Sequence, residues 1–208
     1  MLNVTAILDR FESAVTDSST ELRQRALIWL NMIFKRLSSE RDWLFLYKTA
    51  AGLPITSNVV TLPADFKRLV FCESDDHAWY LIDTDQYSLQ EVAVAQLTTS
   101  DRPNGWTISS TGLQLWPAGS TSTGCNLTYI QTVPDYTDTA TDTIFPDEAE
   151  VCVHRLMLSS FYEYDFDERA GMAASMAAQE LRMLKHWDNQ RQPQPQYLTP
   201  ITVTNYAP

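Results

Sequence analysis

The spacing of apolar residues changes twice along this chain, and this change constrains the fold more than any other feature of the sequence. In residues 3–37, and again after residue 146, apolar side chains recur every three or four positions, as on the buried face of a helix. Between these regions the period falls to two, and short apolar runs alternate with turn residues, which is typical of strands. The sequence therefore predicts an α+β protein: an antiparallel helical bundle formed from both chain ends, with an inserted small β-sheet or sandwich domain.

Two helices are expected at the N-terminal end. The first covers residues 3–16, and its stripe consists of Val4, Ile7, Leu8, Phe11 and Val15. The second is expected to begin near Ser18, because Ser18 and Glu21 have the spacing of a capping box. Its stripe consists of Leu22, Ala26, Trp29, Ile33 and Leu37, widened by Leu30 and Phe34. A stripe this wide indicates contacts on two sides of the second helix.

Short strands are expected from Arg41 to Ile130. In the first strand Trp43, Phe45 and Tyr47 share one side, and Gly52-Leu53-Pro54 is expected to break it. Further strands are expected at residues 59–62, 69–72, 79–82, 106–108, 113–116 and 126–130, with a hairpin turn at 74–76, a candidate short helix at 83–95 and a loop at 118–124. Residues 132–146, rich in Asp and Thr, are expected to form a flexible linker.

Helix is expected to resume at Pro146-Asp147-Glu148, where proline and two acids suit a helix start. The apolar face of this helix consists of Val151, His154, Leu158, Phe161 and Tyr162. After a bend at residues 165–167, the last helix carries a stripe of small residues that ends in leucine: Ala170, Ala173, Ala174, Ala177, Leu181 and Leu184. Residues 188–208 have several prolines and no helical period, which indicates an extended C-terminal arm.

The expected organisation is thus discontinuous. Residues 1–42 and 146–187 form one helical domain, residues 43–145 form the β-rich insertion, and residues 188–208 form the arm. No apolar run approaches the roughly 20 residues of a membrane span, and no signal peptide precedes the first helix, so a soluble protein is expected. Cys72, Cys125 and Cys152 are isolated from one another and are expected to be buried and reduced.

The charge of the chain is unevenly distributed. The net charge is -11, from 15 Lys and Arg against 26 Asp and Glu. Residues 1–48 carry seven basic and six acidic side chains, residues 49–146 carry three and eleven, and residues 147–208 carry five and nine. Because binding to phosphates requires clustered Lys and Arg, this balance argues against a nucleic-acid-binding surface.

No residue pattern predicts catalysis, a cofactor or a metal. Cys152 and His154 are two apart on a helix and face different sides, which removes the obvious thiol–base pair. Asp75-Asp76-His77 fits a solvated turn better than a metal site, and the acids of residues 135–142 lack the glycine and glutamate of a calcium loop. Five tryptophans are expected in the core, namely Trp29, Trp43, Trp79, Trp106 and Trp116. Trp187, at the end of the last helix, is expected at an interface.

Five segments appear in the same order as in a known family. They are Arg41-Asp42-Trp43-Leu44-Phe45, Val60-Thr61-Leu62-Pro63-Ala64-Asp65-Phe66-Lys67-Arg68, Leu113-Gln114-Leu115-Trp116-Pro117, Leu127-Thr128-Tyr129 and Thr143-Ile144-Phe145-Pro146. With the helix–strand–helix plan around them, the chain resembles the head-to-tail adaptor, or connector, proteins of tailed bacteriophages, especially short-tailed ones. The polar segment 86–101 does not follow the family pattern.

The resemblance implies a non-enzymatic virion protein of the phage neck, assembled in the host cytoplasm, with no cofactor and no membrane contact. It implies that 12 copies form a ring under the portal protein, and that the β insertion points toward a downstream tail nozzle or hub protein. DNA would pass through the lumen during ejection without specific binding. The arm would dock on the portal or a neighbour through Tyr197, Leu198, Ile201, Val203 and Tyr206.

The residues themselves support this picture and leave alternatives open. The apolar surface of the flanking helices exceeds what a monomer needs, so Ala170, Ala173, Ala174, Ala177, Leu181 and Trp187 are expected to pack between subunits. A four-helix core that uses all of this surface is the competing interpretation. Two other functions remain open: a virion-associated glycan hydrolase that uses acids such as Asp65 or Asp85, and a carbohydrate- or protein-binding β module on a helical stalk.

Overall fold

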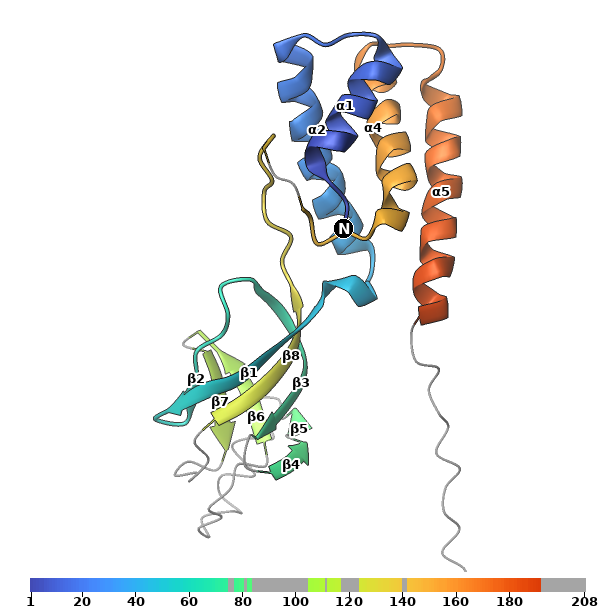
Figure 1. Ribbon diagram of the computed structural model, residues 1–208. Coiled ribbons are helices and arrows are strands. Elements are labelled where there is room, and N and C mark those ends of the chain that lie inside the picture. Colours follow the sequence, from blue (N-terminus) through green and yellow to red (C-terminus); the bar gives the residue numbers. More distant parts are fainter. Residues whose placement is uncertain are drawn as a thin grey trace, which may run out of the picture. The chain divides into compact units, whose positions relative to one another are not determined.

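The computed structural model describes residues 1–74, 77–80, 82–83, 105–110, 112–116, 124–139 and 142–191. The predicted features at residues 75–76, 84–95, 118–123 and 192–208 lie outside the described residues. The chain divides into two compact units, with the boundary between Asp147 and Glu148. The fold combines α-helices with a curled, largely antiparallel β-sheet (Figure 1), as the period of the sequence predicts.

Helices α1 and α2 form a hairpin at the start of the first unit (Figure 1). Helix α1 covers Val4–Val15 and is capped by Asn3, whose side chain accepts a hydrogen bond from the Ala6 amide at 2.9 Å. Helix α2 covers Thr20–Glu40. Its N-cap is Ser19 and not the predicted Ser18, because the extended backbone of Ser19 aims its hydroxyl at the Leu22 amide.

The segment after α2 is not the predicted strand. Leu44–Leu46 form a 3-10 turn, η1, and the first strand begins only at Tyr47. The cause is Trp43, which is fully buried and donates a hydrogen bond from its indole nitrogen to the Leu37 carbonyl at 2.6 Å. Phe45 stacks on Trp43 with ring centroids 5.5 Å apart. The alternating aromatic residues therefore fix the chain at the end of the helix instead of lining a sheet.

Within the described residues, eight strands form one sheet in the order β4-β3-β8-β1-β2-β7-β6-β5. Their bounds are β1 Tyr47–Thr56, β2 Val59–Val60, β3 Phe66–Ser74, β4 His77–Tyr80, β5 Ile82–Asp83, β6 Gly105–Ser109, β7 Gly112–Trp116 and β8 Gly124–Gln131. All neighbours are antiparallel except β5 and β6. A core of apolar side chains lies on the sheet and includes Val60, Leu69, Cys72, Trp106, Leu113, Leu115, Cys125, Leu127 and Tyr129.

Two glycines shape the sheet. Gly52, at φ 65, lies where the register of β1 against β8 shifts between Ala50 and Leu53. Strand β1 thus continues through a bulge where the sequence predicted a break. Gly112 has φ 138, and a Cβ there would lie 2.5 Å from the Val60 carbonyl oxygen, so only glycine fits this approach of β7 to β2.

The return segment comprises residues 132–147, and its described parts, 132–139 and 142–147, are held in place by hydrogen bonds to Leu2 and α2, so these parts are not the flexible linker that their composition suggested. The Leu2 amide donates to the Phe145 carbonyl, and the Thr143 amide donates to the Leu2 carbonyl, both at 3.0 Å. Asn31 on α2 exchanges two hydrogen bonds with the backbone of Tyr136, at 2.8 and 3.0 Å. The Asp and Thr residues of this segment therefore serve a defined structure.

The second unit is a helical hairpin. After the short turn η2, Asp147–Ala149, helix α4 covers Glu150–Tyr164 and packs along α5, which covers Ala170–Arg191. The predicted bend between them is present, but Val151 is exposed and not buried. The buried side of α4 is carried by its neighbours Cys152 and Val153, with Met157 and Leu158. Leu158 was predicted correctly, and His154, Phe161 and Tyr162 are half-buried. Helix α5 also runs further than expected, so residues 188–191 are helical and are not part of the arm that was predicted to begin at residue 188.

Several smaller predictions concern buried residues. The three cysteines, all in the described part of the chain, are buried and form no disulfide, as expected. Trp43 and Trp106 lie in the core and Trp29 is half-buried, while the side chains of Trp79 and Trp116 lie outside the description. Within the described part of the chain, no helix has both the length and the apolar character that a membrane crossing requires.

Candidate functional site

Asp65, a candidate catalytic acid, is held in a structural network. Its carboxylate accepts hydrogen bonds from the Tyr129 hydroxyl at 2.8 Å and from the Lys48 ammonium at 2.7 Å. Burial raises the pKa of Asp65, but the bonds from Lys48 and Tyr129 outweigh this effect, and the pKa lies below its ordinary value. A general acid for glycan hydrolysis needs a raised pKa, so Asp65 does not suit that role. Asp85 lies outside the described residues.

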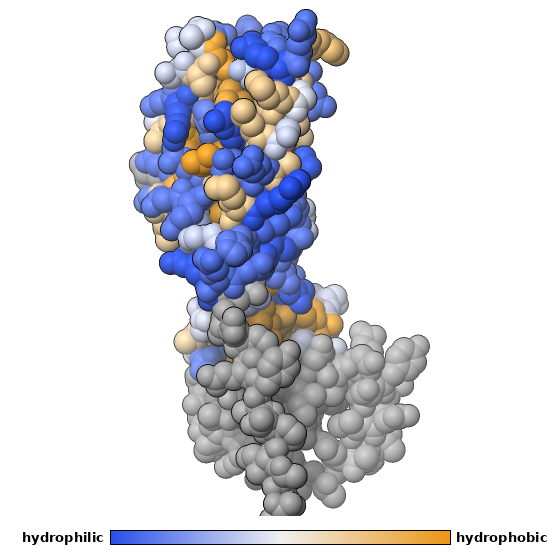
Figure 2. All heavy atoms as spheres, turned by 90° about the vertical axis from the view of Figure 1, so that its right-hand side faces the viewer, coloured by the Kyte–Doolittle hydropathy of each residue, from blue (hydrophilic) through white to orange (hydrophobic). Residues whose placement is uncertain are grey.

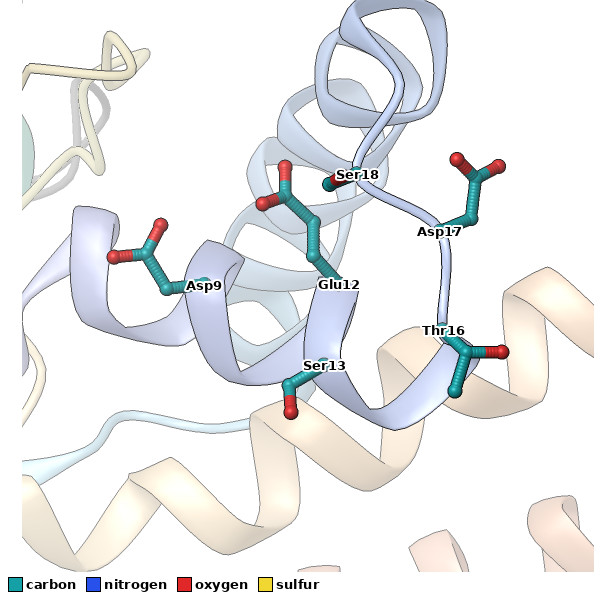
Figure 3. A pocket seen from close by; sticks show the side chains of 6 residues that line it. All are labelled: Asp9, Glu12, Ser13, Thr16, Asp17 and Ser18. Carbon is teal, nitrogen blue, oxygen red and sulfur yellow. The ribbon is translucent and has the colours of Figure 1, made fainter.

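A pocket of about 360 Å³ lies beside the end of α1, lined by Asp9, Glu12, Ser13, Thr16, Asp17 and Ser18 (Figure 3). Its acids do not converge on one point. Asp9 and Glu12 rise from the same side of α1, whereas Asp17 points away from them. Arg23 on α2 pairs with Asp9 at 2.8 Å and with Glu12 at 2.9 Å. The guanidinium of Arg23 therefore balances the charges of Asp9 and Glu12 within the chain.

Arg23 also joins the hairpin to the return segment. Its guanidinium binds both carboxylate oxygens of Asp138, with the shortest contact at 2.8 Å. This hydrogen bond lowers the pKa of Asp138 and raises that of Arg23. Within the described residues, no group of three or more His, Cys, Asp or Glu side chains is arranged to hold a metal ion. These polar clusters fix the fold, and the exposed surfaces of the helices are the better candidates for function.

The outer side of α2 carries apolar side chains between arginines. Ile28 is 59% exposed and Met32 is 62% exposed, and they lie one turn apart on the side of α2 opposite its buried stripe. Arg25 and Arg36, both exposed, lie on the same side of the helix, before Ile28 and after Met32. We call these four residues the basic apolar face of α2. Sequence reasoning missed it because the buried stripe of α2 is itself wide.

Helix α5 has a second exposed apolar surface, formed by Met172, Met176 and Met183. Their spacing of four and seven residues places them on one side of the helix. Figure 2 faces α5, and apolar patches alternate there with hydrophilic ones. The sequence had placed subunit packing on a different side of α5. Of that set, Ala173 and Ala177 are buried within the chain, Ala174 is exposed, and Ala170, Leu181 and Trp187 are half-buried. Arg191 lies over the ring of Trp187 at 4.5 Å.

The turn between α4 and α5 displays two aromatic side chains. Phe166 is 96% exposed and Tyr164 is 55% exposed. Phe166 also has φ 54, a left-handed conformation that is unfavourable for a bulky residue. Around these rings lie Glu163, Asp165, Asp167 and Glu168, with Arg169 as the one base in residues 163–169. We call residues 163–169 the aromatic turn.

The aromatic turn is rigidly built. The backbone amides of Asp165, Phe166 and Asp167 donate to carbonyls at the end of α4, at 2.9, 3.4 and 2.9 Å. The Asp167 carboxylate accepts hydrogen bonds from the backbone amide and from the guanidinium of Arg169. This guanidinium lies 4.4 Å from the ring centroid of Tyr162. These contacts with Arg169 lower the pKa of Asp167 to about 2. The strained, exposed Phe166 is thus held in one position by its surroundings.

Comparison with known proteins identifies the class. A model of the SU10 adaptor protein family matches residues 2–203, which is nearly the whole chain. The chain belongs to the SU10 adaptor protein family. This membership confirms the resemblance to phage head-to-tail adaptors. No curated protein gives a significant match to the sequence.

Membership of the SU10 adaptor family gives the exposed surfaces a context. The family is one of structural adaptor proteins, so surfaces that contact other proteins are its expected functional sites. Among the described residues, the exposed apolar surfaces that are candidates for such contacts are the basic apolar face of α2, the methionines of α5 and the aromatic turn. The arm residues Tyr197, Leu198, Ile201, Val203 and Tyr206 lie outside the described part of the chain.

Proposed function

We propose that this adaptor forms a ring of 12 copies that joins the portal of a short-tailed phage to its tail. Membership of the SU10 adaptor family is the observation that carries this proposal. The exposed apolar side chains of α2 and α5 support it, because a structural protein that works alone has little use for such surfaces. In this proposal, residues 1–42 and 146–187 form the helical domain of each subunit, and their bundle packs against the bundles of neighbouring copies.

The two remaining parts of the chain would provide contacts along the axis of the neck. The C-terminal arm, beyond Arg191, docks on the portal or on a neighbouring subunit, and the β insertion of residues 43–145 faces the tail nozzle or hub. A single arm buries only a few apolar side chains at about 1.5–3 kcal/mol each, less the entropy of ordering. Twelve arms engaged together would convert these weak contacts into a stable attachment.

The lumen of the ring would conduct DNA without holding it. A net charge of -11 for each copy suits this role, because like charges avoid the phosphate contacts that would retain DNA. The protein would reach its place in the virion neck after assembly in the host cytoplasm. We expect no DNA retention in a gel-shift assay at low salt.

Electron microscopy of the purified chain mixed with portal rings of the same phage tests the proposal. We expect a second ring of density on the portal, with one adaptor for each portal subunit. A chain truncated after Arg191 keeps all the described helices and strands, so we expect it to fold but to lose stable attachment to the portal. Failure of the full chain to bind portal rings contradicts the proposal. Equal binding of the truncated chain contradicts the role of the arm.

A further inference from the structure

The aromatic turn has features that the adaptor proposal does not yet use. Phe166 is almost fully exposed, so its ring contributes nothing to the packing of its own subunit. Its left-handed backbone is strained, and such strain persists where the surrounding structure imposes it. The hydrogen bonds at the end of α4 and the pair of Asp167 with Arg169 impose it here. An exposed aromatic side chain on a fixed backbone is suited to fill a pocket on another protein.

The charge around the anchor specifies the surface that it fits. Residues 163–169 carry four carboxylates and one guanidinium, and that guanidinium is already engaged by Asp167. An acidic rim around apolar rings is complementary to an apolar patch with a basic rim. The basic apolar face of α2 has this chemistry, with Ile28 and Met32 at its centre and an arginine on each side. Lys35, which is also exposed, is paired with Asp135 within the chain, so the basic rim consists of Arg25 and Arg36.

The basic apolar face is long enough to receive both rings of the turn. Arg25 and Arg36 are 11 residues apart, which is about 16 Å along a helix at ~1.5 Å per residue. This length leaves room for two aromatic rings on Ile28 and Met32, with an arginine on each side of them. We propose that the aromatic turn of one copy docks on the basic apolar face of α2 in a neighbouring copy.

This contact is heterologous, because two different surfaces meet. Each copy therefore offers one turn and one α2 face, and repetition of the contact generates a closed ring or a filament. The inference rests on the proposed ring and assigns surfaces to the subunit contact within it. The acidic turn and the basic face also exclude the two isologous pairings, since like charges would then oppose each other.

Disulfide trapping tests the contact directly. In a chain that carries both Phe166→Cys and Met32→Cys, oxidation should give a ladder of covalent oligomers on a non-reducing gel, for the chain alone at high concentration or on portal rings. The native cysteines are buried, so they add little background. A mixture of the two single variants should give dimers and nothing larger, because each chain then has one thiol at the contact. The matched control pairs Met32→Cys with Met183→Cys, which lies at a similarly exposed site outside the turn and should give no ladder.

Charge reversal supplies an independent measurement. One variant carries Arg25→Glu and Arg36→Glu, and the other carries Glu163→Lys and Glu168→Lys. In the trapping chain, each should reduce the yield of oligomers about tenfold, because like charges then face each other. The two reversed chains mixed together should recover the yield. Contacts between two α2 faces or between two turns would instead be unaffected by either reversal, which contradicts the proposal.

The remaining outcomes separate this inference from the adaptor proposal. A disulfide formed within one chain, the absence of covalent oligomers, or an equal ladder from the control overturns the docking contact. If rings still form on portal in these cases, the adaptor function stands and a different surface joins the subunits. If the chain neither binds portal nor associates with itself, both proposals are wrong.

Discussion

The two helical hairpins of this chain differ in how far their side chains find partners within the chain. Around α1, α2 and the return segment, aromatic and polar groups find partners within the chain: Phe34 stacks on Phe145 at 4.3 Å, and Arg23 binds carboxylates from two segments. In the second hairpin, three methionines of α5 and Phe166, in the turn before it, are exposed instead. The first hairpin buries one side of α2 against the return segment and leaves its basic apolar face exposed, whereas the second hairpin also carries an exposed aromatic turn.

The largest test of this contrast is the core of the first hairpin. Phe34 is fully buried, and its ring contacts Phe145 and also Tyr136 at 5.4 Å. We expect Phe34→Ala to lower the free energy of unfolding by about 3–5 kcal/mol, because it leaves a cavity between α2 and the return segment. Met172→Ala on α5 is the control, with an expected change within about 0.5 kcal/mol. Equal losses in urea denaturation would contradict the contrast.

The next effect concerns the hydrogen bonds that hold the return segment. Asn31 accepts from the Tyr136 amide and donates to the Tyr136 carbonyl. We expect Asn31→Ala to cost about 1–3 kcal/mol, since both backbone groups lose a partner in a half-buried site. Gln24→Ala, at an exposed position of the same helix, should be nearly neutral in the same thermal unfolding experiment. If residues 132–147 are in fact loosely held, both variants will melt alike.

Phe166 should give a smaller effect of opposite sign. Glycine adopts a positive φ without strain, so we expect Phe166→Gly to stabilise the folded chain by about 1 kcal/mol, because the relieved strain of about 1–3 kcal/mol exceeds the extra chain entropy of about 0.5–1 kcal/mol that glycine loses on folding. Phe166→Ala is the matched control, because it removes the same exposed ring but keeps the unfavourable backbone conformation. Calorimetry should rank glycine above alanine and phenylalanine. A loss of stability in both variants would show that the ring packs within its own subunit.

The ion pair of the aromatic turn should give the smallest effect, visible as a change in titration. The folded-state pKa of Asp167 is about 2, below its ordinary value of 3.8, so its contribution to stability is present above pH 4 and is lost as the pH falls toward 2. We expect Arg169→Gln to raise this pKa toward 3.8, measured by NMR on the Asp167 carboxyl. An unchanged pKa in the variant would assign the shift to the backbone amide alone.

The helices and most strands could be predicted from the sequence because the spacing of apolar residues indicates which side of a helix or strand is buried. That information is weakest where one side chain decides the outcome. Trp43 and Phe45 alternate as in a strand, yet the hydrogen bond from Trp43 to Leu37 turns this segment into a 3-10 turn. Likewise, the return segment reads as low complexity, and only its distant partners, such as Asn31, give it structure.

The candidate surfaces were harder to predict for a related reason. Ile28 and Met32 fall outside the buried stripe of α2, and their spacing alone does not say whether a second element covers them or whether they face solvent. Phe166 has no periodic neighbour, and its exposure follows from the turn geometry that Arg169 and Asp167 enforce. The family was indicated instead by short segments in a fixed order, and the match of the family model to residues 2–203 confirms it.

The contacts of the return segment also determine when α2 can complete its packing during synthesis. Asn31 and Tyr136 are 105 residues apart, and a ribosome working at ~5–20 residues per second needs about 5 to 20 seconds to pass from one to the other. During that interval α2 lacks the aromatic partners that cover Phe34. Helices α4 and α5 emerge later still, so a nascent chain can offer its aromatic turn to other molecules only once its first helices have their final neighbours.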